Sequence, residues 1–245
     1  MSVGEAPAGL EISPEELMTI NAARELRDGQ VCLVGVGPPN AAANLARRLQ
    51  APGCVLVYES GAIGAQPVRL PLSIGDDDLA ETALELVSVV EMFNFWIGGG
   101  RIDVGFLGAA QIDPHANLNT TAIGPYEQPK VRLPGAGGAP EIAACAKSVI
   151  VIARHSPRTF VERLDFVTSL AHRRGHTVVI TDLGVLRPAE DGELELVAVH
   201  PGVEVDQARE ATGWDLRVAE TLERTEPVTQ RELDELRELR ASARR

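Results

Sequence analysis

Hydrophobic and polar positions along the chain form two patterns, short apolar runs and longer helical stripes. The apolar runs are rich in Val, Leu and Ile and predict strands at residues 31–34, 55–58, 103–107, 148–153, 177–181 and 194–199. The stripes predict helices at residues 14–26, 40–49, 83–95, 140–145 and 229–245, with a further start at 76–78. Strands alternating with helices predict an α/β fold, with a mainly parallel sheet and helices on both faces.

Local signals mark where several of these helices begin and end. Ser13 with Glu16 forms a capping box around a proline in the first turn, and Gly29 ends that helix. Asn40 is expected to cap the second helix. The carboxylates of residues 76–78 suit the positive N-terminal end of a helix.

No linker or internal repeat divides the chain, so we expect one domain over residues 1–224 and a charged helical tail over 225–245. In the tail, Leu233, Leu236 and Leu239 form one apolar seam among charged residues. The seam suits packing on its own domain or on a partner. The pairs Arg231–Glu235 and Asp234–Arg237 stand at helical spacing.

Composition excludes several classes of function. The formal net charge of −12 argues against a nucleic-acid groove or an anionic membrane surface as partner. The three cysteines, Cys32, Cys54 and Cys145, lie in apolar surroundings without a CxxC spacing, which indicates buried thiols in a reducing compartment. Neither a signal peptide nor a membrane span is visible, so we expect a cytoplasmic protein.

The first candidate for chemistry is the segment after the run 55–58, which reads Glu59, Ser60, Gly61. Open α/β sheets bind ligands at the carboxyl edge of their strands, so a carboxylate there is a candidate nucleophile. A glutamate is ionised at neutral pH and needs no base to activate it. Glycine at 61 would let a ligand approach the backbone. The competing interpretation is a solvated loop glutamate.

Two further segments carry candidate ligand-binding groups. Gln111 and Asn119 follow the strand at 103–107, and both have amides that can donate or accept hydrogen bonds. Residues 135–139 form a glycine-rich loop before a helix, where Gly137, Gly138 and Ala139 can present backbone N–H groups to an anion or an oxyanion. The loop lacks the Lys-Ser/Thr of a phosphate-binding Walker loop. The loop at 35–37 would form another wall of the ligand pocket, or is only a tight turn.

The other polar motifs favour no second chemistry. His172 and His176 stand four residues apart, but Gly175 interrupts the segment and no further ligand is near in sequence, so we expect no metal. A Gly-x-Ser-x-Gly elbow is missing, which disfavours a serine hydrolase.

Taken together, Tyr-Glu-Ser-Gly at 58–61, the segment 108–119 and the glycine loop at 135–139 resemble the β subunit of class I CoA-transferases, most closely the glutaconate type, over residues 14–220. The resemblance implies a CoA-transferase-like fold of isomerase-like topology. It also implies that Glu59 is catalytic and forms a glutamyl-CoA thioester. Ser60, Gly61, Gln111, Asn119, Gly137, Gly138 and Ala139 would line the acyl-CoA site.

The resemblance also implies partners and substrates. Coenzyme A would be a substrate, as acyl-CoA, with no permanently bound cofactor. The acids would be dicarboxylic or 3-oxo acids, and an α-type subunit would complete an α2β2 or larger assembly.

Alternatives stay open within the same fold. Transferases of the succinyl type often read Ser-Glu-Asn-Gly around the nucleophile, whereas this chain reads Glu-Ser-Gly. A decarboxylase and a ring-opening hydrolase of this fold lack the glutamate, so Glu59 argues against both. An acyl-CoA hydrolase, or a non-catalytic ligand-binding subunit, remains possible from the sequence.

Overall fold

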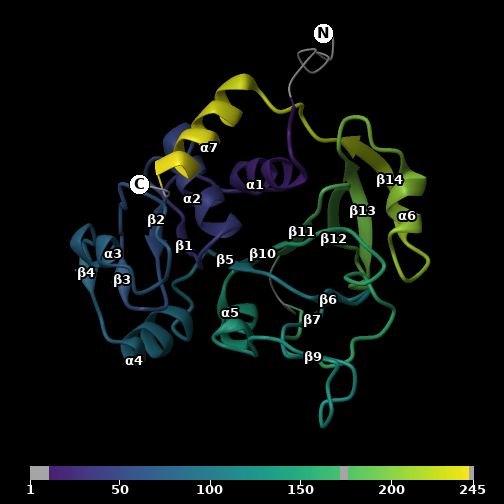
Figure 1. The fold of residues 1–245 in the computed structure, drawn as a ribbon, viewed down its shortest axis with the longest axis horizontal. Helices are drawn as coiled ribbons and strands as arrows, with labels where there is room; N and C mark the ends of the chain where they lie inside the picture. The colour runs from purple at the N-terminus through teal and green to yellow at the C-terminus, as the bar shows by residue number, and fades with distance from the viewer. Residues whose placement is uncertain (1–10, 172–175, 243–245) are drawn as a thin grey trace. The chain divides into compact units, whose positions relative to one another are not determined.

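The structure is a computed structural model that describes residues 11–171 and 176–242 of the 245 in the chain (Figure 1). It contains two compact units, described here one at a time. Unit 1 comprises the described parts of Met1–Phe106, Cys145–Lys147 and Pro227–Arg245, and unit 2 comprises those of Leu107–Ala144 and Ser148–Glu226. The division into a domain at 1–224 and a tail at 225–245 stays a prediction.

Unit 1 combines a sheet with helices. Its strands are β1 (Val31–Leu33), β2 (Val55–Val57), β3 (Ala62–Ile63), β4 (Glu85–Leu86) and β5 (Val104–Leu107). Its helices are α1 (Pro14–Arg24), α2 (Pro38–Leu49), α3 (Asp77–Glu81), α4 (Val89–Glu91), the π-helix η1 (Met92–Ile97) and α7 (Gln230–Ser242).

The strand order in unit 1 is β5-β1-β2-β3-β4. Strand β1 pairs in parallel with β2 and β5, because α2 connects β1 to β2 and returns the chain to the same edge. Strands β3 and β4 are antiparallel to their neighbours. The parallel strands are those expected from the apolar runs, and the antiparallel pair adds an edge that the sequence pattern did not predict.

Helices α1, α2 and α7 pack together within unit 1 (Figure 1). Leu233 and Leu236 of α7 are fully buried there, and Leu239 is buried as well. The apolar seam of the tail therefore packs on its own chain, one of the two arrangements expected for it.

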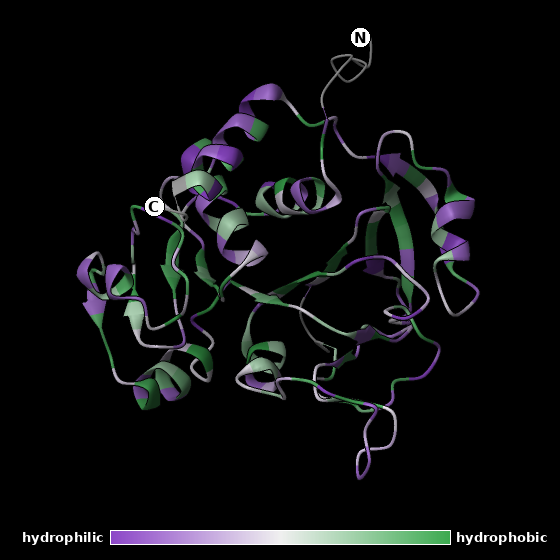
Figure 2. Cartoon of the chain, in the orientation of Figure 1, coloured by the Kyte–Doolittle hydropathy of each residue, from purple (hydrophilic) through white to green (hydrophobic). Residues whose placement is uncertain are grey.

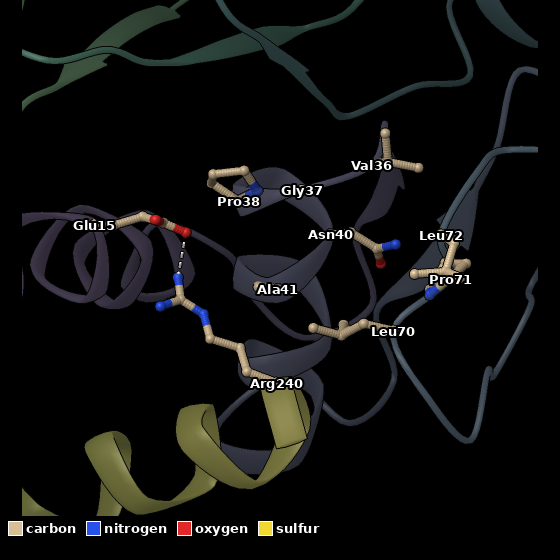
Figure 3. Close-up of a pocket in the computed structure, with 10 residues that line it drawn as sticks. All are labelled: Glu15, Val36, Gly37, Pro38, Asn40, Ala41, Leu70, Pro71, Leu72 and Arg240. Carbon is tan, nitrogen blue, oxygen red and sulfur yellow. Dashed lines mark hydrogen bonds and ion pairs between the residues drawn. The ribbon is translucent and has the colours of Figure 1, made fainter. Parts of the chain in front are cut away.

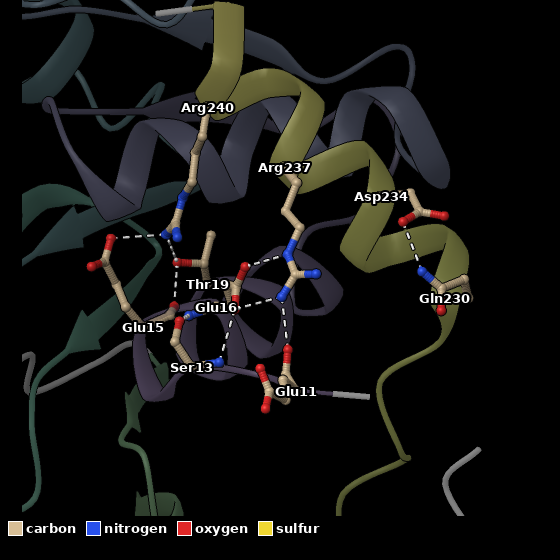
Figure 4. A network of polar contacts seen from close by, with 9 residues as sticks. All are labelled: Glu11, Ser13, Glu15, Glu16, Thr19, Gln230, Asp234, Arg237 and Arg240. Atoms are coloured by element: carbon tan, nitrogen blue, oxygen red, sulfur yellow. Dashed lines mark hydrogen bonds and ion pairs between the residues drawn. The ribbon is translucent and has the colours of Figure 1, made fainter. Parts of the chain in front are cut away.

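Charged contacts fix α7 on α1 (Figure 4). Arg237 of α7 binds Glu16 of α1 at 2.7 Å, and Arg240 binds Glu15 at 2.8 Å. Within the described part of the tail, the expected pairs Arg231–Glu235 and Asp234–Arg237 are not formed. Glu235 pairs instead with Arg48 of α2 at 3.3 Å and Arg237 with Glu16 of α1, while Asp234 accepts a hydrogen bond from Gln230 of its own helix.

The described residues of unit 2 form strands and the helices α5 and α6. They are β6 (Gln111–Ile112), β7 (Leu118–Asn119), β8 (Ala122–Ile123), β9 (Val131–Arg132), β10 (Ser148–Ile152), β11 (His176–Ile180), β12 (Gly184–Pro188), β13 (Leu194–Val199), β14 (Arg217–Arg224), α5 (Ala139–Cys145) and α6 (Val205–Glu210). Strands β10 and β11 are parallel, β12 runs antiparallel to both of its neighbours, and β13 and β14 are parallel.

The fold is an α/β fold with a mixed, mostly parallel sheet and helices, as predicted. Apolar residues fill most of the longer strands, which are green in Figure 2, whereas β14 and α7 are largely hydrophilic. The cysteines are free thiols; Cys32 and Cys54 are buried, but Cys145 is only half-buried, contrary to expectation. It is the last residue of α5.

Two predictions about helices were wrong. Residues 83–95 do not form one helix, because Leu84 and Leu86 lie beside β3 instead and a helix begins only after Ser88. Asn40 does not cap α2, which begins two residues earlier, at Pro38, with Gly37 as its N-cap. The pattern also missed strands β12 and β14.

Candidate active site

Glu59 lies in a turn that joins β2 to β3 in unit 1. The turn is closed by two backbone hydrogen bonds, from the N–H of Gly61 to the carbonyl of Tyr58 and from the N–H of Tyr58 to the carbonyl of Ala62, each 2.9 Å long. Glu59 and Ser60 occupy the tip of this turn, and both are half-buried. The carboxylate is therefore held at the carboxyl end of a strand, as the sequence predicted.

Gly61 allows the turn to form because no other residue fits there. Its φ is +106°, and a Cβ atom would lie 1.9 Å from the carbonyl oxygen of Val87. The N–H of Val87 donates to the carbonyl of Gly61 at 3.0 Å. The close backbone approach at this glycine is thus made by the chain itself. Contact between Gly61 or Ser60 and a substrate stays a prediction.

The residue before Glu59 is anchored in the core. The Tyr58 side chain is fully buried, and its hydroxyl donates to Oδ1 of Asn40 at 3.0 Å. Burial raises the pKa of the Tyr58 phenol, so the hydroxyl stays protonated and acts as a donor. This hydrogen bond ties the end of β2 to the first turn of α2.

A cavity of about 470 Å³ opens in unit 1 at the first turn of α2 (Figure 3). Its lining includes Val36 and Gly37 from the loop after β1, Asn40 and Ala41 from α2, and the segment 70–72. Glu15 and Arg240, paired with each other, form its charged side. The loop at 35–37 is therefore a cavity wall, one of the two roles considered for it.

Sequence reasoning missed Asn40 and the segment 70–72 as lining residues. The signal present was the Gly-Val-Gly-Pro-Pro-Asn string at a strand end, which places a polar side chain in the first turn of a helix. Nothing local predicted residues 70–72, because they reach the cavity through a long irregular segment.

In unit 2, Gln111 and Asn119 lie opposite each other on β6 and β7. Nδ2 of Asn119 donates to Oε1 of Gln111 at 2.7 Å, and Nε2 of Gln111 donates to Asp165 at 2.9 Å. Oδ1 of Asn119 accepts from the N–H groups of Thr121 and Ala122. The two amides are brought together and bond one another, so they shape the adjoining loops. Their role in substrate binding stays a prediction.

The glycine loop is attached to this same part of unit 2. The N–H of Gly135 donates to the carbonyl of Thr120, and the hydroxyl of Thr120 donates to the carbonyl of Gly135. The backbone of Gly137 has a φ of +51°, and α5 begins at Ala139. The N–H of Ala139 is used within the loop, whereas those of Gly137 and Gly138 donate to no residue in the described part of the chain.

The described histidines lie in separate surroundings. In the described ranges, no three His, Cys, Asp or Glu side chains are grouped so as to hold a metal ion. His155 is buried between Thr181 and Thr212 and stacks on Phe160, and burial lowers its pKa to about 4. His172 lies outside the described residues.

Comparison with known families matches residues 16–211 to the family described as Coenzyme A transferase. This match spans most of the chain, including Glu59 and the glycine loop. The chain belongs to the coenzyme A transferase family. The resemblance seen in the sequence motifs is thereby confirmed.

Relatives place this CoA-transferase among subunits of the B type. It is 52% identical over 243 residues to the B-type subunit of 3-oxoadipate CoA-transferase from Pseudomonas knackmussii, with 94% of each chain covered. It is 33% identical over 233 residues to the B-type subunit of glutaconate CoA-transferase from Acidaminococcus fermentans, with 87% of each covered. The chain is an enzyme subunit, a CoA-transferase subunit of the β type.

Solved structures show how widely the fold of this CoA-transferase is used. The A. fermentans glutaconate CoA-transferase structure superposes with a TM-score of 0.85 at 32% identity, covering 93% of this chain and 94% of that one. The decarboxylase AibA/AibB superposes with a TM-score of 0.83 at 26% identity, covering 93% and 94%. Because a decarboxylase shares the fold, the reaction must be argued from the site residues.

Proposed function

We propose that Glu59 is the nucleophile of this CoA-transferase and carries CoA as a glutamyl thioester between two acids. The observation that carries the proposal is the position of Glu59, half-buried in a fixed turn at the carboxyl end of β2. Two hydrogen bonds restrict the backbone of this turn, and a restricted backbone limits the positions of the carboxylate, which favours attack on a bound thioester.

The reaction consists of two exchanges on the same carboxylate. A Glu59 oxygen attacks the thioester carbonyl of the donor acyl-CoA, forming an acyl-glutamyl anhydride as the CoA thiolate leaves. The thiolate then attacks the glutamyl carbonyl, releasing the donor acid and leaving CoA bound to Glu59. The acceptor acid reverses both steps, so the thioester bond energy is kept and the kinetics are ping-pong.

Groups that stabilise charge are available in unit 2. The N–H groups of Gly137 and Gly138 can donate to an oxyanion or to a phosphate of CoA. Gln111 and Asn119 bond one another in the hairpin to which the glycine loop is attached through Thr120, and the proposal assigns both to binding of the acyl-CoA. These groups support the proposal because hydrogen bonds hold the glycine loop and the hairpin together within unit 2.

The proposed substrates are a dicarboxylic or 3-oxo acid and its CoA ester. The relatives with 52% and 33% identity are named for 3-oxoadipate and glutaconate, both dicarboxylic acids. Coenzyme A takes part as substrate, so no permanently bound cofactor is required.

The proposed partner is an α-type subunit, in an α2β2 or larger assembly in the cytoplasm. Its support is the B-type designation of the relatives, which implies a counterpart of another type. None of the described helices has the length and apolar content needed to span a membrane.

Mass spectrometry of the complex with its α-type subunit tests the proposal. Acyl-CoA alone should give a CoA adduct on Glu59, and borohydride should then reduce its thioester to a primary alcohol at the same residue with release of CoA. In Glu59→Gln the adduct should vanish and transfer should fall at least about a thousandfold, because the nucleophile is gone.

Glu59→Asp is the matched control, since it keeps the charge and shortens the side chain by one methylene. It should still form an adduct, more slowly. An adduct on another residue, or full transfer by Glu59→Gln, would overturn the proposal. Release of free CoA without an acceptor acid would show a hydrolase instead.

A further inference from the structure

The side chain of Asn40 is an unusual feature of the unit 1 cavity. It is 1% exposed and lines the cavity from the first turn of α2. Its Nδ2 is buried, and none of the residues that the structure describes accepts a hydrogen bond from it. An unpaired buried donor costs about 1–3 kcal/mol, and an acceptor bound in the cavity would remove this cost.

The neighbours of Asn40 fix which of its amide atoms faces the cavity. Nδ2 of Asn44 donates to the backbone carbonyl of Asn40 at 3.0 Å, so that atom is a nitrogen. The same nitrogen lies 2.6 Å from the side chain of Asn40, whose facing atom is therefore the oxygen. The Tyr58 hydroxyl donates to that oxygen too. The amide nitrogen is thus turned toward Pro71 and Leu72, as Figure 3 shows.

The helix that carries Asn40 adds a second feature that favours an anion. Helix α2 has 12 residues, its N-cap Gly37 offers no side chain, and its first turn contains no acidic residue. The backbone N–H of Asn40 donates to no residue within the described ranges. Pro38 and Pro39 have no N–H, so the first turn offers a carboxylate the N–H of Asn40 and the positive end of the helix dipole.

The walls of the cavity suit an acyl chain. Val36, Leu70 and Leu72 contribute apolar side chains, and Leu72 is 73% exposed at this site. A volume of about 470 Å³ lies within the range of small-molecule sites. The carboxylate of Glu15 is neutralised by Arg240 and does not repel an anion strongly.

The cavity is coupled to the proposed nucleophile through one side chain. Tyr58, which binds Asn40, directly precedes Glu59 in the turn after β2. A ligand on Asn40 therefore lies next to the element that positions Glu59.

We propose that this cavity receives the acyl group of a dicarboxylic acid, and that Nδ2 of Asn40 and the N-terminus of α2 bind its non-reacting carboxylate. The inference rests on the proposed transferase function and makes Asn40 a residue that determines specificity. Acids that lack the second carboxylate would leave this donor unpaired and would bind less tightly.

The variant Asn40→Asp tests this with little change in shape. It keeps an oxygen for Tyr58 and Asn44 but replaces the Nδ2 donor by an acceptor. The helix N-terminus and the two donors favour the ionised aspartate, which repels a second carboxylate. With glutarate as acceptor acid, we expect KM to rise about ten- to a hundredfold in the complex, as expected for a lost charged hydrogen bond. With butyrate, KM should change less than about twofold.

Asn94→Asp, the same change at an exposed site on η1, serves as the matched control and should leave both values unchanged. If Asn40→Asp fails to assemble, Leu72→Asp at the exposed wall replaces it, and a rise in KM for glutarate alone is again expected. An equal rise in KM for glutarate and butyrate, or no rise for either acid, would overturn the inference.

Direct binding separates this inference from the proposed function. In the complex carrying Glu59→Gln, calorimetry should show glutarate binding that Asn40→Asp weakens about tenfold or more. That result supports the cavity even if no transfer occurs in any variant. Absence of glutarate binding to the Glu59→Gln complex overturns the inference even if Glu59 proves to be the nucleophile.

Discussion

Two glycine turns in this chain look alike in sequence and differ in physical cause. At Gly61 the backbone of Val87 occupies the space where a side chain would be. At Gly135 and Gly137, which also have positive φ, a Cβ atom would meet nothing within 4 Å. The first glycine is required by packing inside the chain. Gly135 and Gly137 leave open space, and the N–H groups of Gly137 and Gly138 donate to no residue that the structure describes, which suits a ligand-binding loop.

Gly61→Ala should break the closed turn and has the largest expected effect on stability. The new methyl group would overlap the Val87 carbonyl at 1.9 Å, and alanine at a φ of +106° is strained in addition. The free energy of unfolding should fall by more than about 3 kcal/mol, measured by thermal or urea denaturation. A loss below about 1 kcal/mol would show that the β3–β4 segment moves freely away from the turn.

Gly137→Ala should have the opposite profile, with a small effect on folding and a larger one on activity. At a φ of +51° alanine costs about 1 kcal/mol, and nothing within 4 Å blocks its methyl group. If the loop binds the acyl-CoA, the methyl group enters that space and kcat/KM should fall about ten- to a hundredfold.

The measurement for Gly137→Ala is the kinetics of the complex beside its melting temperature. Unchanged kcat/KM with the expected small drop in stability would remove the loop from the acyl-CoA site. Gly192→Ala provides a control, because this glycine also has a positive φ and open space but lies in the turn between β12 and β13.

Elements held by contacts near in sequence were predicted, and elements held by contacts far apart in sequence were not. Helix α1 was predicted with its start because the capping box of Ser13 and Glu16 is local, and both of its hydrogen bonds are formed. Residues 83–95 were misinterpreted because the N–H of Leu84 bonds Ile63, twenty-one residues away in sequence. The sequence pattern around residue 84 does not indicate a partner so far away.

The candidate site divides in the same way. Glu59 was predicted because a strand end followed by Glu-Ser-Gly is visible in the sequence. Asn40 was misassigned as a cap because α2 begins two residues earlier, at Pro38, and its contact with Tyr58, eighteen residues away, was not visible in the local pattern. The network of Gln111 and Asn119 was also invisible, since it requires Asp165 from a distant loop.

Glu16 and Glu59 also differ in their roles. Glu16 stabilises the fold through Arg237, whereas Glu59 is the proposed nucleophile. The hydrogen bond from Arg237 lowers the pKa of Glu16 to about 2, from an ordinary value of 4.5. A carboxyl with a lowered folded-state pKa stabilises the protein above its unfolded pKa and loses this contribution as pH falls toward the folded value. The contribution is therefore full above about pH 5 and declines between pH 4.5 and 2.

Glu16→Gln should remove this charge while keeping a side chain that completes a capping box. At pH 7 we expect a loss of about 1 kcal/mol, modest because Arg237 is half-exposed and solvent screens the pair. Denaturation at pH 7, 5 and 3 should show the difference between wild type and variant shrinking as the medium becomes acidic. A difference that stays constant across this range would mean that the buried part of Glu16, rather than its charge, fixes α7 on α1.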